Sequence, residues 1–99
     1  MHTEYLISAE EFCASHEIEI SFIRLLEQTG LIELETVHES PVIRKEQLRQ
    51  LEIFINLHYE LEINMEGIET ITHLLQRMSV MHNEIILLRN RLRLHEDNQ

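Results

Sequence analysis

A long apolar stripe near the end of the sequence constrains the fold more than any other feature. Seven large apolar side chains recur there at alternating steps of three and four positions, namely Ile71, Leu74, Met78, Met81, Ile85, Leu88 and Leu92. This spacing keeps one face of an α-helix apolar over three full heptads, which is typical of a coiled coil. A chain of 99 residues offers little other surface against which such a stripe can be buried. We therefore expect a long C-terminal helix that forms a homodimer through these seven residues.

Two properties of this helix stay open in the sequence. The helix could instead fold back on the core of its own chain, which would also bury an apolar stripe. The direction of pairing in a dimer is open as well. Glu84 and Arg89 have the g and e spacing of charges that pair between the helices of a parallel coil.

The composition indicates one small, mainly helical chain. It has two glycines and one proline, and 43% of its residues are apolar, enough for one core. The single cysteine, Cys13, excludes a disulfide within the chain, and no Cys/His cluster indicates a metal or cofactor. No apolar run approaches 18 residues, and the N-terminus lacks the pattern of a signal peptide. We expect a cytoplasmic protein that is not inserted in a membrane.

Hydrophobic patterning divides the chain into a head, residues 1–63, and an arm, residues 64–99. The predicted elements of the head are a short strand or extended lead-in at 3–7, helices at 9–15 and 19–29, a two-stranded wing at 32–43 with Pro41 near its turn, and a helix from 44 onward. Ser8 and Glu11 have the spacing of a capping box for the first helix. Gly30 is expected to end the second helix, and Asn64 to cap the arm.

Most of the negative charge lies in the head. The formal net charge is −10, and residues 1–43 hold nine acidic residues against one base, Arg24. DNA-binding proteins gain most of their affinity by neutralising phosphates with Lys and Arg, so we expect no direct DNA binding. An acidic surface around apolar side chains suits a protein partner instead. The candidate partner-binding residues are Phe22 and Leu25 on the second helix, with the acids Glu17, Glu19, Glu27, Glu33, Glu35 and Glu39. Phe22 could also pack under the wing or against the third helix.

Two segments carry a resemblance to a known family. They are "YLISAEEFCASHEIEISFIRLLEQTGLIE" (5–33) and "IRKEQLRQLEIFINLHYELEINMEGIETITHLL" (43–75). Together they resemble the MerR class of winged helix-turn-helix regulators. Within that class, "HYELEINMEGIETITHLL" and the later "LLRNRLR" are similar to CbpM-like chaperone modulators.

The resemblance implies a mainly α fold, with a MerR-like winged helix-turn-helix head, a small β wing and a long C-terminal coiled-coil helix. It favours antiparallel pairing of the long helices. It also implies a non-enzymatic protein that binds the J-domain of a DnaJ-like, CbpA-type co-chaperone and inhibits its action on Hsp70. The alternative is a MerR-like transcription regulator or anti-regulator. The basic and aromatic positions of MerR recognition helices are occupied here by Ser21, Phe22, Leu25 and Leu26.

Enzymatic chemistry finds little support in the sequence. His58 and Glu62 stand four apart, as do Glu69 and His73, but neither pair has a third ligand or a glycine-rich loop nearby. Surface pairs at this spacing are common on helices. We therefore expect no enzyme activity.

Overall fold

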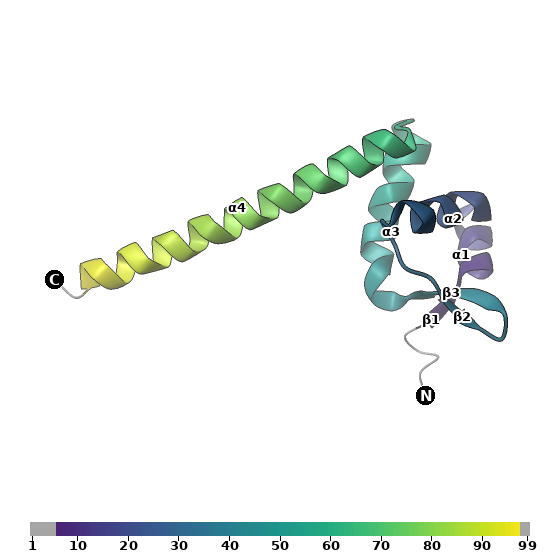
Figure 1. Ribbon diagram of the computed structural model, residues 1–99, viewed down its shortest axis with the longest axis horizontal. Helices are drawn as coiled ribbons and strands as arrows, with labels where there is room; N and C mark the ends of the chain where they lie inside the picture. Colours follow the sequence, from purple (N-terminus) through teal and green to yellow (C-terminus); the bar gives the residue numbers. More distant parts are fainter. Residues whose placement is uncertain (1–5, 98–99) are drawn as a thin grey trace. The chain divides into compact units, whose positions relative to one another are not determined.

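The computed structural model describes residues 6–97, and its element order is that of a winged helix-turn-helix (Figure 1). The elements are β1 (Leu6–Ser8), α1 (Ala9–His16), α2 (Ile20–Thr29), β2 (Glu35–Val37), β3 (Ser40–Arg44), the 3-10 helix η2 (Lys45–Gln47), α3 (Leu48–Ile55), the π-helix η3 (Asn56–Glu60) and α4 (Met65–Asp97). The chain forms two compact units, of which the first ends at Ile68 and the second begins at Glu69. The predicted fold class is confirmed.

Helix α1 begins at the predicted cap. The Ser8 hydroxyl accepts a hydrogen bond from the backbone N–H of Glu11 over 3.3 Å, which is the first half of the expected capping box. The helix runs to His16, one residue beyond the predicted end, and Glu17 closes it in the left-handed conformation with a φ of 56°. The buried face of α1 carries Phe12 and Cys13.

Helix α2 ends where the glycine predicts. Gly30 has a φ of 86°, a conformation that glycine adopts without strain. Its N–H donates to the Glu27 carbonyl over 3.0 Å, and the N–H of Leu31 donates to the Leu26 carbonyl over 2.9 Å. These two bonds form a Schellman motif, which satisfies the last carbonyls of the helix and turns the chain toward the wing.

The sheet has the strand order β1-β3-β2 and is antiparallel throughout. The predicted lead-in covers residues 3–7, of which 3–5 lie outside the described part of the chain, and β1 covers Leu6–Ser8. The predicted wing is confirmed as the hairpin β2–β3, but residues 32–34 are irregular and the first strand begins only at Glu35. Figure 1 shows the three strands together, with the hairpin turn at their edge.

The wing turn lies close to Pro41, as expected. Pro41 lies within β3, opposite Thr36, while the turn is made by His38 and Glu39 with φ values of 51° and 66°. Proline cannot occupy such a turn because its ring fixes φ near −65°. Strand β1 pairs with β3 only as far as Val42, so the missing N–H of Pro41 interrupts no bond to that strand.

One core joins these elements. Its buried apolar residues are Ala9, Phe12, Cys13, Phe22, Ile23, Leu26, Ile32, Ile43, Leu51, Phe54 and Ile68. Fully burying one large side chain of this kind contributes about 1.5–3 kcal/mol, so the core supplies most of the stability of the head. The residues come from both helices of the helix-turn-helix, the wing, α3 and the first turn of α4.

The third predicted helix is divided into three pieces, the 3-10 helix η2, α3 and the π-helix η3. In the π-helix, the N–H of Leu61 donates to the Asn56 carbonyl over 3.1 Å, five residues back. Glu62 then takes a φ of 56° and ends the segment. His58 and Glu62 therefore do not share a helical face, which corrects the pairing considered from their spacing.

Asn64 caps α4 as predicted. Its Oδ1 accepts a hydrogen bond from the N–H of Gly67 over 2.8 Å. A Cβ atom at position 67 would lie 2.6 Å from Cγ2 of Ile63 and 3.2 Å from Oδ1 of Asn64. Only glycine fits this close approach, so the cap and the glycine belong to one local arrangement.

Six of the seven predicted seam residues on α4 are exposed in the single chain: Leu74, Met78, Met81, Ile85, Leu88 and Leu92, each about half accessible. Ile71 is half-buried. The homodimer stays a prediction. Among residues 6–97, no helix combines the length and the apolar character that a membrane span requires.

Candidate functional site

A groove with a volume of about 550 Å³ runs along the exposed face of α2. We call it the α2 groove. It is lined by Glu19, Ser21, Phe22, Arg24, Leu25, Gln28, His58, Tyr59, Asn64 and Met65. Its size lies within the usual range for binding sites. All ten residues belong to the first compact unit, so the groove is complete within the head and the start of α4.

The helical repeat of α2 explains one wall of the groove. Ser21, Arg24, Leu25 and Gln28 follow the i, i+3, i+4, i+7 spacing of one helix face, and all four are exposed. Ile23 and Leu26 point to the core from the opposite face. This outward face carries one charge, that of Arg24, and one large apolar side chain, Leu25, which is 44% exposed.

Three aromatic rings form the floor. Phe22 stacks on His58 with 4.6 Å between ring centroids and meets Tyr59 edge-on at 5.3 Å. His58 and Tyr59 are themselves perpendicular, at 4.9 Å. Such pairs contribute about 0.5–1.5 kcal/mol beyond the area they bury.

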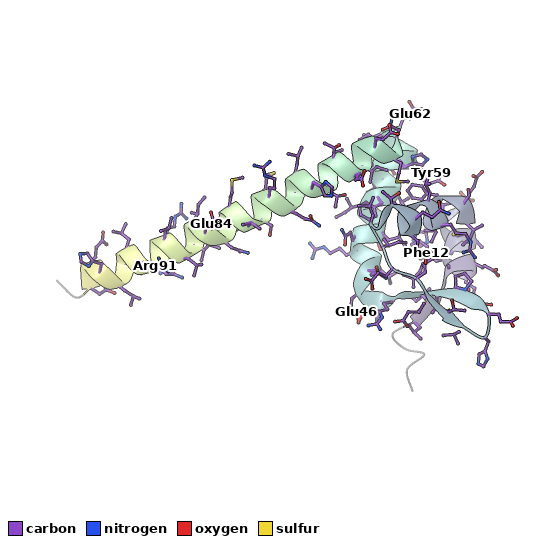
Figure 2. All side chains as sticks on the ribbon, viewed as in Figure 1. Phe12, Glu46, Tyr59, Glu62, Glu84 and Arg91 are labelled. Carbon is purple, nitrogen blue, oxygen red and sulfur yellow. The ribbon has the colours of Figure 1, made fainter. Side chains whose placement is uncertain are left out.

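Phe22 is 5% exposed, so it does not form the exposed apolar spot that we considered from the sequence. The alternative is correct: Phe22 packs against the end of the third helical segment. The physical reason is the π-helix η3, which brings two neighbouring aromatic rings onto the side chain at once. Figure 2 marks Tyr59 and Glu46 toward opposite ends of the third predicted helix, in η3 and η2 respectively.

Hydrogen bonds fix both rings of η3. Nδ1 of His58 lies 3.0 Å from the Ile63 carbonyl oxygen, and because a carbonyl can only accept, Nδ1 carries the proton. In the neutral ring, Nε2 is then an acceptor. The hydroxyl of Tyr59 accepts from the backbone N–H of Glu19 over 3.2 Å. The floor is thus tied to the N-cap residue of α2.

Two of the predicted acids lie at the corner between α1 and α2. Glu17 closes α1, and Glu19 stands at the N-cap position of α2, where Ser21 donates to its Oε2 over 3.2 Å. Both side chains are exposed. Carboxylates at a helix N-terminus are favoured by the helix dipole, so Glu19 has a local role in addition to lining the groove.

The wing acids lie outside the lining of the groove. Glu35 pairs with Arg44 across the hairpin, and this hydrogen bond and charge raise the pKa of Arg44. Its charge is therefore already matched within the chain. Glu33 is exposed, and its backbone makes two hydrogen bonds to the side-chain amide of Gln47. The Glu33 N–H donates to Oε1 over 2.8 Å, and Nε2 donates to the Glu33 carbonyl over 2.7 Å. Glu39 forms part of the wing turn.

The structure therefore brings together Glu19, Phe22 and Leu25 from the predicted set and leaves the other acids elsewhere. Glu27 is half-buried on α2 and does not line the groove. Sequence reasoning missed His58, Tyr59, Asn64 and Met65 as lining residues. Residues 58 and 59 lie 29 or more positions beyond the end of α2 at Thr29, and the sequence holds no signal for the π-helix that positions them. The helical spacing on α2 was a usable signal for Ser21 and Gln28.

The other chemical groups of the head suit structure better than reaction. Cys13 is buried, and burial raises the pKa of its thiol above the ordinary value of 9.0. A thiol of this kind is a poor nucleophile. Within residues 6–97, no group of three or more His, Cys, Asp or Glu side chains could hold a metal ion.

A comparison with protein families identifies the scaffold. The model described as "MerR HTH family regulatory protein" matches residues 7–90. The chain belongs to the MerR helix-turn-helix family. No curated protein and no solved structure matches it. In helix-turn-helix proteins the second helix reads the major groove of DNA. In this MerR-family chain the second helix is α2, and the outward face that would read DNA is the wall of the α2 groove.

Proposed function

We propose that the protein is a non-enzymatic chaperone modulator, which binds the J-domain of a DnaJ-like, CbpA-type co-chaperone and inhibits its action on Hsp70. The observation that carries the proposal is the outward face of α2. In a helix-turn-helix scaffold this face meets DNA, yet here it presents one arginine beside a groove with an aromatic floor. The resemblance of residues 58–75 to CbpM-like modulators supplies the partner.

Electrostatics disfavours DNA at this surface. Residues 1–43 carry a net charge of −8, with Arg24 as their single base. Double-stranded DNA presents one negative charge per about 1.7 Å, and two like charges about 4 Å apart near a protein surface repel by up to about 4 kcal/mol before salt screening. A basic protein surface meets the opposite sign and is attracted.

The groove suits one helix of a partner. The proposed J-domain presents a Lys/Arg-rich helix on the face that docks on Hsp70. The aliphatic stems of its basic side chains would lie on Leu25 and Met65, while their charged ends reach Glu17 and Glu19. The exposed ring of Tyr59 offers a cation–π contact. Covering this helix excludes Hsp70 by occupancy, and no reaction is needed.

The proposed homodimer fits this function. Two chains paired through the seam residues would bury the exposed apolar side chains of the seam and present two α2 grooves. Each groove lies within one chain, so each would bind one J-domain. The stoichiometry of the complex should therefore be one J-domain per chain.

A second candidate function is a MerR-like transcription regulator or anti-regulator, and family membership is the observation that favours it. A gel-shift assay against the promoter region of the protein's own gene separates the two functions. A specific shift that survives about 150 mM salt, where exposed charges are largely screened beyond about 8 Å, would reverse the ranking.

Isothermal titration of the protein with the J-domain of a CbpA-type co-chaperone from the same organism tests the proposal. We expect saturable binding that weakens with salt, together with loss of the co-chaperone's stimulation of Hsp70 ATPase activity. The absence of binding at about 100 µM protein and low salt, a concentration that detects complexes of about −5 kcal/mol, would refute it.

A further inference from the structure

The arm carries a second apolar row in addition to the predicted seam. Val80, Leu87 and Leu94 are spaced seven residues apart on α4 and are 57%, 58% and 64% exposed. Residues seven apart lie almost above one another along a helix, so these three side chains form a line. We call them the outer row. Their sequence positions are not among the seven seam residues.

A helix that covers the seam leaves the outer row uncovered. At seven residues per two turns, the outer row lies about 130° around the helix from the centre of the seam. In a two-stranded coiled coil, the charged residues that flank the seam lie between the seam and the outer row. A helix that is apolar on more than one side is normally buried on more than one side. We therefore expect a second surface to cover the outer row.

Polar side chains border the outer row in a regular pattern. On the flank nearest the seam lie Arg77, Glu84 and Arg91, again seven apart and alternating in sign. On the other flank lie Asn83 and Asn90. Two hollows occur on this side of α4, one of about 420 Å³ beside Val80 and one of about 300 Å³ between Glu84, Leu87 and Arg91. Figure 2 marks Glu84 and Arg91 on the arm.

We propose that the outer row binds the outer row of a second copy of this chain, with the two helices antiparallel. A two-fold axis at Leu87 places this residue against Leu87 of the second copy. Val80 then faces Leu94 of the second copy, and Leu94 faces Val80. All three apolar layers are filled by the same pairing.

The polar flanks decide the direction and the register. The same two-fold axis places Glu84 opposite Arg91 of the second copy on one flank, and Asn83 opposite Asn90 on the other. Charges at such flanking positions set partner choice and orientation between helices. Parallel pairing in register would instead bring the charged flank against the other flank, so that Glu84 and Arg91 would face Asn83 and Asn90 and form no ion pair. Ion pairs between the flanks therefore form only in the antiparallel direction.

The outer row has three apolar layers, whereas the seam has seven residues. Because apolar burial scales with area, pairing through the outer row is weaker and should follow seam pairing as concentration rises. Each seam dimer carries two outer rows, so the expected product is an assembly of four or more chains, built from seam dimers joined along their arms. This inference concerns assembly and does not depend on the J-domain as partner.

Sedimentation equilibrium of the full chain between about 10 µM and about 1 mM tests the proposal. The wild type should rise from the mass of two chains to that of four or more. Leu87→Ser should remove the upper step and leave two chains at every concentration. The seam variant Ile85→Ser, matched in chemistry, should affect the lower step instead. If the seam does not pair, association through the outer row alone gives the wild type the mass of two chains. Leu87→Ser should then have the mass of one chain.

The charge pattern provides the second test. Arg91→Glu should weaken the outer-row association at least about tenfold, because it opposes two carboxylates at each flank. The double variant Glu84→Arg with Arg91→Glu restores opposite charges at both contacts and should recover it. The proposal is overturned if Leu87→Ser leaves the assembly of the wild type unchanged, whatever its size. It is also overturned if the charge-exchanged variant associates no better than Arg91→Glu. Helix content by circular dichroism verifies that each variant is folded.

Discussion

The hydroxyl of Tyr59 accepts a hydrogen bond from the backbone N–H of Glu19 over 3.2 Å, joining positions 40 residues apart. The first N–H groups of a helix have no partner within the helix, and Glu19 stands at the N-cap position of α2. One bond from η3 therefore helps to fix the start of α2 and the floor of the groove beside it.

Replacing Tyr59 by Phe removes this bond and keeps the ring. Because the site is exposed, water can replace the hydroxyl, and the free energy of unfolding should fall by only about 0.5–1.5 kcal/mol. Urea denaturation measures this change. A loss above about 3 kcal/mol would show that the bond holds more of the head than one exposed hydrogen bond can.

Phe22 and Leu25 are three residues apart on α2, but their replacement by Ala should have opposite consequences. Phe22 is 5% exposed, so Phe22→Ala should lower the free energy of unfolding by about 3–5 kcal/mol. Leu25 is 44% exposed, so Leu25→Ala should change stability by less than about 1 kcal/mol.

For partner binding we expect the exposed residue, Leu25, to matter directly. Leu25→Ala should weaken J-domain binding about tenfold, equivalent to about 1.4 kcal/mol, while the head stays folded. Denaturation curves and titrations of both variants provide the comparison. Unchanged binding by folded Leu25→Ala would remove this side chain from the proposed contact surface.

Cys13 predicts a loss of stability at alkaline pH. Burial raises the pKa of the Cys13 thiol above 9.0 in the folded chain, so the unfolded chain releases this proton at a lower pH. The contribution of the neutral thiol is complete below about pH 9 and is lost as the pH rises through the folded-state pKa. Unfolding measured from pH 7 to 10.5 should show this loss in the wild type and a smaller loss in Cys13→Ala. Equal curves would contradict the assignment.

Ile85→Glu tests the seam. The substitution places a charge at the centre of the distal seam, where burying it is unfavourable. Sedimentation at about 100 µM should then show a monomer or a weakened dimer, with the head still folded. A wild type that is already monomeric at this concentration would contradict the coiled-coil interpretation of the seven seam residues.

Local signals made much of the fold predictable. The caps at Ser8 and Asn64, the glycine at position 30 and the heptad spacing after Ile71 each depend on neighbouring residues, and the first three appear in the structure as expected. The turn at His38–Glu39 was harder to predict. Neither residue is glycine, so the left-handed conformation of both had no strong signal in the sequence.

The groove was predictable only in part, because its α2 wall and its aromatic floor differ in origin. The α2 wall follows a helical period that can be read from residues 21–28. The floor depends on the π-helix Asn56–Glu60, whose hydrogen bonds span five residues instead of four, and this leaves no period that can be read from the sequence. Phe22 is buried against His58 and Tyr59 of this π-helix, so its burial could not be predicted from α2 alone.

The most direct test of the account compares two variants with the same change of charge. Glu17→Gln/Glu19→Gln removes Glu19, which lines the α2 groove, and Glu17, two residues before it at the corner between α1 and α2. Glu33→Gln/Glu39→Gln removes two exposed acids from the wing region. Isothermal titration with the CbpA-type J-domain should show about tenfold weaker binding for the groove variant. The wing variant should bind within about threefold of the wild type, as expected for long-range charge alone. Equal losses in both variants, or a larger loss in the wing variant, would contradict docking at the α2 groove.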